Sequence, residues 1–292
     1  MGAAPVASDT EWLPAVGRVL GGAARVVGRA PLGGGYASAG VERVDLDVDG
    51  RAVPVVVKRA TAVEVAAMRA LAVVRGVHRP RALAVGTDRL VLPHYAGAPL
   101  RDGDPVPDAV WEVLSRVHAH WWRKRPRGLP VVDAAWWRGL CERTLVAVRG
   151  ASARTGDPAY ADAERSLVAW STDQRIRTAL AVLPRTLVHG DPHRGNVLSG
   201  PDGVVLIDWG NARVASAGLD LAVLRAQGAT VAAAYERPGP PALRPVEEAW
   251  ADVHVHVQYL GFAADHLGAA RVAEMVATAS RALDALDAAL RG

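Results

Sequence analysis

Asparagine is almost absent from this chain, and both copies lie in one polar segment, LVHGDPHRGNVLSGPDGVVLIDWGN, residues 187–211. Asp191 precedes Asn196 by five residues, and Asp208 follows twelve residues later, at the end of an apolar run typical of a strand. A carboxylate and a carboxamide offer the hard oxygen ligands that Mg²⁺ prefers, so we expect Asn196 and Asp208 to hold this ion. Asp191 would then be available to hold a hydroxyl group. Phosphoryl transfer requires this division of roles, because ions neutralise the phosphates while an acceptor oxygen is held in line.

The spacing of these residues matches a known pattern. In the protein kinase catalytic loop, an aspartate is followed five residues later by an asparagine and then by an Asp-Phe-Gly motif. Here Asp191, Asn196 and the tripeptide DWG at 208–210 stand in those places. More narrowly, HGDPHRGN resembles the His-Gly-Asp-x-His-x-Gly-Asn signature of the aminoglycoside phosphotransferase family, and VVLIDWGNA and LDLAVL resemble the strand and helix that follow it there. The resemblance extends over residues 30–224. It implies that a small hydroxylated molecule is phosphorylated with Mg²⁺ and with ATP, or alternatively GTP, as donor.

The resemblance also implies a role for each matching position. It places a lysine on the ATP phosphates, a glycine-rich loop around them, an inter-lobe hinge that receives adenine, a catalytic aspartate and two metal ligands. These roles fall on Lys58, on Gly34, Gly35 and Ser38, on His94 and Tyr95, on Asp191, and on Asn196 and Asp208. Lysine is rare, since only Lys58 and Lys124 occur among 34 basic residues, which independently indicates that arginine is unsuitable at Lys58. The alternatives are a lysine at a strand edge that reaches into water, and glycines that form only a flexible turn.

Other polar residues have two interpretations each. Glu64 could pair with Lys58, or it could complete a capping box in which Thr61 caps the following helix. His189 and His193 could brace the loop by hydrogen bonding or transfer protons. Two further residues, Asn211 and Asp220, are outside the predicted catalytic set: Asn211 could cap a turn or touch an ion, and Asp220 is expected to brace the catalytic loop.

The segment also departs from the family pattern. Arg194 stands where proline is common, Trp209 replaces phenylalanine, and ASAG at 215–218 replaces a Gly-Asp-Pro sequence. No reacting group is lost, so these departures bear on the subfamily and its substrate. The tryptophan pairs 121–122 and 136–137 are expected in helices, with one member of each pair facing outward and able to line a substrate site.

The elements that must position these groups change in period along the chain. Residues 24–29, 41–48 and 51–58 have strand patterns, with a hairpin turn at Asp49-Gly50, and residues 61–74 have helical spacing. RALAVG and RLVLPHY then predict two more strands. After a Gly/Pro-rich connector at 96–107, helical spacing predominates; the predicted helices lie at 107–122, 157–183, 218–235 and 245–290, interrupted by two short strands, NVL and VVLID. We therefore expect an α+β, protein-kinase-like fold, with an antiparallel-sheet N-lobe at 1–96 and a mainly helical C-lobe at 97–292.

Composition excludes several other classes. The net charge is +4, but the basic residues are dispersed except for RKRPR at 123–127, so we expect no nucleic-acid partner. There is no apolar run of membrane-spanning length and no signal-peptide pattern, which predicts a cytoplasmic protein without a membrane partner. The single cysteine, Cys141, is expected to be buried in a helix without a chemical role. We expect a monomer or a homodimer.

The acceptor is less defined than the reaction. Residues 97–292 carry 22 basic and 22 acidic side chains, but 240–292 lean acidic, with Glu247, Glu248 and Asp252 near a candidate substrate helix. An aminoglycoside or nucleoside-type antibiotic is the predicted acceptor, and a sugar, an amino alcohol or a choline-like metabolite is the alternative. Two other classes stay open: a metal-dependent hydrolase that uses His189, Asp191 and His193 as ligands, and a nucleotide-binding module without catalysis.

Overall fold

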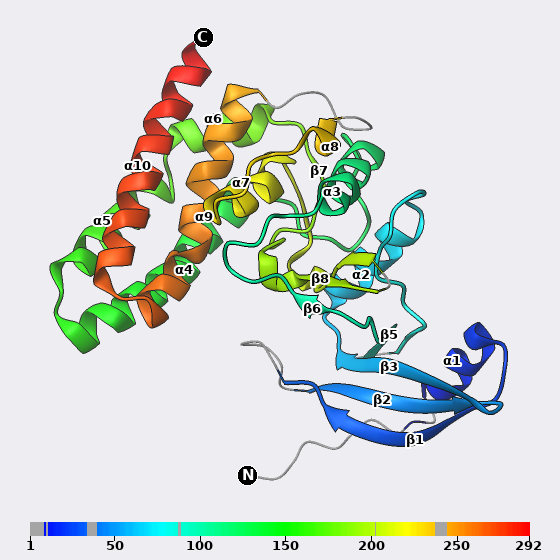
Figure 1. The fold of residues 1–292 in the computed structure, drawn as a ribbon. Coiled ribbons are helices and arrows are strands. Elements are labelled where there is room, and N and C mark those ends of the chain that lie inside the picture. The colour runs from blue at the N-terminus through cyan, green and yellow to red at the C-terminus, as the bar shows by residue number, and fades with distance from the viewer. Residues whose placement is uncertain (1–8, 10, 34–39, 87–88, 202, 237–243) are drawn as a thin grey trace.

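The computed structural model describes residue 9 and residues 11–33, 40–86, 89–201, 203–236 and 244–292 (Figure 1). A small lobe built on an antiparallel sheet lies at the bottom of Figure 1, and a larger, mainly helical lobe lies above it. The small lobe contains α1 (Leu13–Leu20), β1 (Ala24–Pro31), β2 (Val41–Val48), β3 (Arg51–Arg59), α2 (Ala62–Ala72), β4 (Ala84–Val85) and β5 (Arg89–Pro93). The predicted α+β architecture is confirmed; the division at residue 96 stays a prediction.

The five-stranded sheet has the order β1-β2-β3-β5-β4 and is antiparallel throughout. Strands β2 and β3 form the expected hairpin, in which Val48 pairs with Arg51 across a two-residue turn. Asp49 and Gly50 have φ values of 49° and 80°, and an Asp-Gly pair suits a turn with two positive φ angles. This hairpin leads the chain directly to Lys58, near the end of β3.

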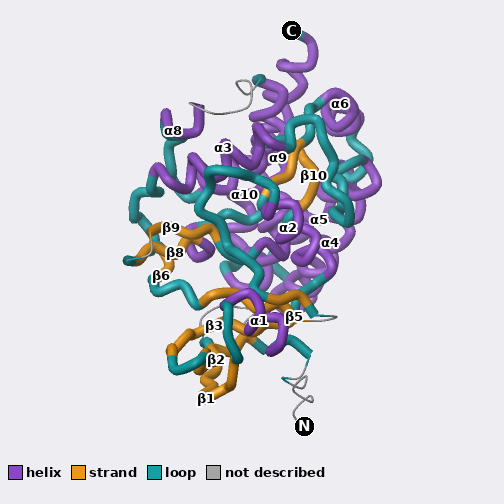
Figure 2. Tube along the Cα trace, turned by 90° about the vertical axis from the view of Figure 1, so that its right-hand side faces the viewer, coloured by secondary structure: helices purple, strands orange, loops and turns teal. Residues whose placement is uncertain are grey.

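Two apolar cores position the sheet. One face, with Leu46 and Val55, packs against Trp12 and Val16 at helix α1, which the strand and helix patterns did not predict. Helix α2 lies between the sheet and the helical lobe in both views (Figures 1 and 2). Its buried residues, including Leu71, share a core with β5 of the sheet and with α3 of the large lobe.

The large lobe consists mostly of helices. It contains β6 (Ala98–Pro99), α3 (Asp108–His120), α4 (Ala134–Thr155), α5 (Pro158–Trp170), α6 (Gln174–Val182), β7 (Thr186–Val188), the 3₁₀ turn η1 (Arg194–Asn196), β8 (Val197–Gly200), β9 (Gly203–Leu206), the 3₁₀ turn η2 (Trp209–Asn211), β10 (Arg213–Ala215), α7 (Gly218–Ala226), α8 (Ala233–Glu236), α9 (Pro245–His266) and α10 (Ala269–Arg291). The three long helical stretches predicted at 157–183, 218–235 and 245–290 are each interrupted. Two of the interruptions contain a glycine with positive φ, Gly228 (80°) and Gly268 (85°), a conformation that ends a helix readily.

Short strands hold the polar segment in place. Strand β7 pairs with β10, and β8 pairs with β9 and with β6, which directly follows the small lobe. The contact between the linker and β8 requires glycine, because a Cβ atom at Gly200 would lie 1.8 Å from the carbonyl oxygen of Ala96. The predicted strand VVLID ends earlier than expected, at Leu206, so Asp208 lies in the turn beyond it.

Of the helices in the described residues, none combines the length and apolar character that crossing a membrane requires. Cys141 is buried in α4, and burial raises the pKa of its thiol to about 12. The thiol is therefore protonated at neutral pH, and its burial in a helix agrees with the sequence prediction.

Candidate active site

Asp191 lies in the loop that follows the buried strand β7. Gly190 allows this loop to turn: its φ is 83°, and a Cβ atom there would lie 2.3 Å from the carbonyl oxygen of Asn211. One carboxylate oxygen of Asp191 accepts a hydrogen bond from the Tyr259 hydroxyl, and the other accepts one from the side-chain amide of Asn211 at 3.1 Å. Burial raises the pKa of Tyr259, so it remains a protonated donor. The two contacts fix the orientation of the Asp191 carboxylate.

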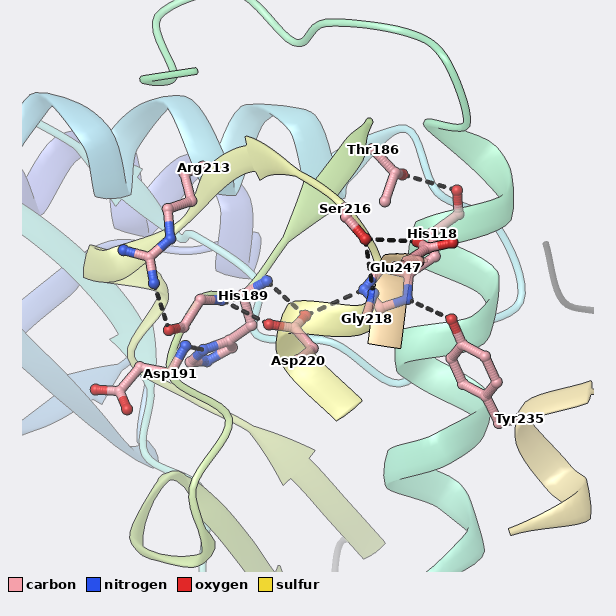
Figure 3. A network of polar contacts seen from close by, with 11 residues as sticks. His118, Thr186, His189, Asp191, Arg213, Ser216, Gly218, Asp220, Tyr235 and Glu247 are labelled. Atoms are coloured by element: carbon pink, nitrogen blue, oxygen red, sulfur yellow. Dashed lines mark hydrogen bonds and ion pairs between the residues drawn. The ribbon is translucent and has the colours of Figure 1, made fainter. Parts of the chain in front are cut away.

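Asp220, at the start of helix α7, braces the Asp191 loop from the side (Figure 3). The backbone N–H groups of His189 and Gly190 each donate to the Asp220 carboxylate at 2.8 Å, and His118 contacts it through Nε2 at 3.1 Å. The other ring nitrogen of His118 meets the Tyr235 hydroxyl at 2.9 Å. Burial alone would raise the pKa of Asp220, but the hydrogen bond and charge of His118 and the N–H donors hold it below its ordinary value. The sequence expectation of a bracing role agrees with this arrangement.

His189 connects the loop to the end of β9. Its Nε2 lies 2.8 Å from the carbonyl oxygen of Ile207, and its Nδ1 accepts the N–H of Asp191 at 3.2 Å. This pairing requires the neutral tautomer with the proton on Nε2, and burial lowers the pKa of His189 accordingly. His193 has a similar local role, since its Nδ1 accepts the N–H of Gly195 at 3.0 Å. Both histidines therefore make the bracing contacts that the sequence suggests.

Asn196 is almost buried, with 8% of its surface exposed. Its side-chain nitrogen donates to the carbonyl oxygen of Asp191 at 2.9 Å, which orients the amide and leaves Oδ1 as the atom that could bind an ion. Its own carbonyl oxygen accepts the N–H of Ile207 at 2.8 Å, so Asn196 is tied to the residue that precedes Asp208.

Asp208 has left-handed backbone angles, with φ and ψ both 62°, at the start of the turn η2. Aspartate tolerates this conformation better than most residues do. Its side chain is 49% exposed, and the carboxylate lies 3.1 Å from the ammonium of Lys58. The next residue, Trp209, is fully buried, donates to the Leu206 carbonyl oxygen at 2.9 Å and packs on His189. In place of phenylalanine, it anchors the turn that carries Asp208.

Lys58 brings the small lobe to the same site. Its ammonium is 2.7 Å from Glu64 of helix α2 as well as 3.1 Å from Asp208. Burial alone would lower the pKa of Lys58, but the charges of Glu64 and Asp208 raise it above its ordinary value, so the group stays charged at neutral pH. Of the two predicted roles of Glu64, the structure has the ion pair: its carboxylate pairs with Lys58, and the helix is capped by Thr61, whose hydroxyl accepts the Glu64 N–H at 3.1 Å.

The predicted nucleotide contacts are less defined. Gly34, Gly35 and Ser38 lie outside the described residues. His94 and Tyr95 directly follow β5, where the His94 N–H donates to the Pro54 carbonyl oxygen at 3.1 Å and the Tyr95 hydroxyl accepts the Arg81 N–H at 3.0 Å. Any adenine contact at this linker must therefore use other backbone groups, and the adenine role stays a prediction.

Sequence reasoning missed several residues of the site. Tyr259 and Gln258 come from helix α9, and Gln258 donates to the Gly190 carbonyl oxygen at 2.9 Å. Arg213 donates to the same oxygen at 2.8 Å. Arg194 is 6% exposed and donates from Nε to the Asp104 carbonyl oxygen at 2.9 Å, so it ties the loop to the connector. Of these residues, only Arg194 was marked in the sequence, because it stands where the family pattern commonly has proline.

The geometry does not match a transition-metal hydrolase. Both ring nitrogens of His189 contact backbone groups, so neither is available as a ligand. Within the described residues, no group of three His, Cys, Asp or Glu side chains could hold a metal ion.

A comparison with family models matches residues 29–254 to the phosphotransferase enzyme family, which is more than half of the chain. The chain belongs to this family. The predicted resemblance is therefore confirmed, and this phosphotransferase acts on an alcohol group of an acceptor. A comparison with curated proteins finds no match.

Solved structures with the same fold include kinases of different acceptors. A putative fructosamine-3-kinase from Thermobifida fusca aligns with a TM-score of 0.60 and 20% identity, over 93% of this chain and 98% of that one. A choline/ethanolamine kinase family protein from Mesorhizobium loti aligns with a TM-score of 0.57 and 18% identity, over 89% and 92%. Spectinomycin phosphotransferase, in complex with ADP and spectinomycin, aligns with a TM-score of 0.51 and 13% identity, over 92% and 93%. At these identities the likeness shows the fold, which confirms the predicted kinase-like, two-lobe architecture of this phosphotransferase.

Proposed function

We propose that this phosphotransferase moves the γ-phosphoryl group of ATP, or alternatively GTP, to a hydroxyl group of a small molecule, with Asp191 as the catalytic residue. The observation that carries the proposal is the convergence of both lobes. Lys58 of the sheet contacts Asp208, and Asp208 is joined through Ile207 to Asn196, whose amide holds the Asp191 loop. Phosphate-binding and acceptor-orienting groups are thus held in one connected network.

Asp191 would hold the acceptor hydroxyl in line with the γ-phosphorus and can take its proton. A loose phosphoryl-transfer transition state needs little early deprotonation, so orientation is the larger contribution. Lys58 has three N–H donors, and two are directed to Glu64 and Asp208. The third can reach a phosphate oxygen, and the charge on Lys58 favours the anionic nucleotide.

The residues present fit Mg²⁺. Asn196 presents Oδ1, because its nitrogen is occupied, and the Asp208 carboxylate is half-exposed and reachable. These hard oxygen ligands would hold the ion, which when bound supplies positive charge to the phosphate oxygens. Asn196 does not titrate, so it can bind an ion without competing for the acceptor proton.

The acceptor we propose is a hydroxylated antibiotic of the aminoglycoside or nucleoside type, whose O-phosphorylation would give resistance. A metabolite kinase that acts on a sugar, an amino alcohol or a choline-like compound is the second candidate. It is favoured by the similarity to proteins named as fructosamine-3-kinase and choline/ethanolamine kinase, which align with higher TM-scores than the spectinomycin enzyme does.

The test is a product screen. Purified protein is incubated with ATP and Mg²⁺ and a library of hydroxylated antibiotics and metabolites, and mass spectrometry detects gain of one phosphoryl group. We expect at least one acceptor to be phosphorylated, and chelation of Mg²⁺ to stop the reaction. Stoichiometric zinc in active protein that works without Mg²⁺ would instead support a hydrolase, and absence of transfer to every compound would contradict the proposal.

A further inference from the structure

The acidic residues of helix α9 do not provide a cation-binding site at Asp191. Glu247 is 1% exposed, and its carboxylate accepts a serine hydroxyl at 2.5 Å. Glu248 and Asp252 both pair with Arg225 of helix α7, at 3.9 and 2.8 Å. These three residues lie seven to twelve positions before Tyr259, which is roughly 10 to 18 Å along a helix that rises 1.5 Å per residue. The acidic residues that give the C-terminal sequence its negative charge therefore make contacts within the fold.

Positive charge lies beside Asp191 instead. The guanidinium of Arg213 donates to the Gly190 carbonyl oxygen at 2.8 Å, one residue before Asp191, and lies 4.9 Å from the centre of the Trp136 ring. Arg143, two turns further along helix α4, places its guanidinium 5.8 Å from the centre of the same ring. The Trp136 ring thus contacts two cations, of which Arg213 also contacts the loop, and aromatic rings stabilise such an arrangement.

The two arginines differ in accessibility. Arg213 is 6% exposed and has a structural role, since it also contacts Gln258 of α9. Burial lowers its pKa to about 10, so it remains charged at neutral pH. Arg143 is exposed, and within the part of the chain that the structure describes it forms no ion pair. Its fork of N–H donors is available to hydroxyl, carbonyl, carboxylate or phosphate oxygens of an acceptor.

We propose that the acceptor is a neutral or anionic hydroxyl compound without ammonium groups near the reacting hydroxyl, and that Arg143 is a residue that recognises it. This inference rests on the proposed function and narrows its acceptors to the nucleoside-type antibiotics and the sugars, so it excludes the aminoglycosides, amino alcohols and choline-like compounds named there. A polycationic acceptor would place ammonium groups beside Arg143 and Arg213, where like charges repel each other. A sugar, a nucleoside or an acidic polyol would instead gain hydrogen bonds from Arg143.

The experiment compares charge classes at matched concentration. Wild-type protein, Arg143→Gln and Arg143→Glu are assayed with ATP and Mg²⁺ against three groups of hydroxylated compounds: polycationic aminoglycosides, uncharged sugars and nucleosides, and sugar acids. We expect neutral or anionic compounds to be phosphorylated in preference to polycations. For the best acceptor, Arg143→Glu should lower kcat/KM about tenfold or more, mainly by raising KM. An effect of this size is typical of losing a hydrogen bond to a charged group.

Controls separate the two proposals. ATP binding, measured by titration without acceptor, should be the same in the Arg143 variants as in wild type. Arg138→Glu, an exposed charge change on the same helix, should leave kcat/KM unchanged. Efficient phosphorylation of polycations, or an unchanged KM in Arg143→Glu, would overturn the proposal about acceptor charge and Arg143, but not the proposed function. Absence of transfer to every class would overturn the proposed function itself.

Discussion

The Asp191 carboxylate is held by two neutral donors, the Tyr259 hydroxyl and the Asn211 amide. Neither donor is a cation, so the two contacts orient the carboxylate without an ion pair. An incoming hydroxyl group therefore meets an acceptor oxygen in a fixed position, which is the condition for effective orientation of a nucleophile.

Replacing Asp191 with Asn keeps the shape of this group but removes the charge. We expect kcat to fall by about two orders of magnitude or more, the scale of general-base contributions, while ATP binding is largely preserved. Turnover with a phosphorylated acceptor and ATP titration measure the two effects. Asp162→Asn, in an exposed ion pair with Arg165 on helix α5, is a matched control that should behave as wild type. Near-normal turnover in Asp191→Asn would mean that the catalytic segment has been misinterpreted.

Lys58 and Lys124 form a natural pair for comparison, because they are the two lysines of the chain. The Lys58 side chain is 15% exposed, and its ammonium contacts Glu64 and Asp208, whereas the ammonium of Lys124 donates to a backbone oxygen at an exposed position. A planar guanidinium cannot reproduce the compact Lys58 contacts. We therefore expect Lys58→Arg to raise the KM for ATP and to lower kcat, and Lys124→Arg to leave both unchanged. Equal ATP kinetics in the two variants would show that Lys58 is incidental.

At the scale of elements, helices α4 and α9 meet around a buried histidine. The His254 ring stacks on Trp136 and contacts Trp137 and Trp250, and neither ring nitrogen has a hydrogen-bond partner among the described residues. Burial, together with the charge of Arg213, holds the pKa of His254 well below its ordinary value of 6.5. The folded state thus keeps this ring neutral, while the unfolded chain takes up a proton below about pH 6.5.

Because the unfolded state binds the extra proton, His254 makes stability fall as pH drops below about 6.5. His254→Phe keeps an aromatic ring in the same packing and removes the titration. Below that pH, we expect the wild type to lose stability relative to the variant. The difference between their free energies of unfolding should grow by up to about 1.4 kcal/mol per pH unit. Urea unfolding at pH 8, 6.5 and 5.5 measures this difference. A constant difference at all three values would show that His254 does not titrate on unfolding.

Elements with local signals were predictable. The β2–β3 hairpin follows from the Asp-Gly turn, and the roles predicted for Asp191 and Asn196 rest on residue types, spacing and the resemblance to the phosphotransferase signature. Helix α1 and the strands β7 and β10 were not predicted, because they are short and are stabilised by tertiary packing or pairing. Tyr259 lay beyond reach for the same reason: it is an ordinary helical residue until the fold brings α9 beside the catalytic loop.

At the scale of the whole molecule, nucleotide binding is expected to stabilise the fold, since ligands that bind only the folded state shift the unfolding equilibrium. At a concentration of ATP and Mg²⁺ about 100 times Kd, the gain is about 2.7 kcal/mol, or several degrees in Tm for a chain of this size. Thermal unfolding with ATP, with and without Mg²⁺, measures it. In Asp208→Asn the Mg²⁺-dependent part should be largely lost, and a wild-type-sized Mg²⁺ effect there would argue against Asp208 as a ligand.

Helix α2 shares one core with β5 and with α3, Trp209 and other residues of the large lobe, and this has a consequence for folding cooperativity. If each lobe had a separate core, melting would proceed in two steps. Because the apolar face of α2 is covered from both sides, unfolding either lobe exposes the same residues, so we expect a single calorimetric transition. A fragment of residues 1–96 would leave that face open to water, and we expect it to be unstructured by circular dichroism. The two lobes, which each supply part of the active site, would then unfold cooperatively as one unit.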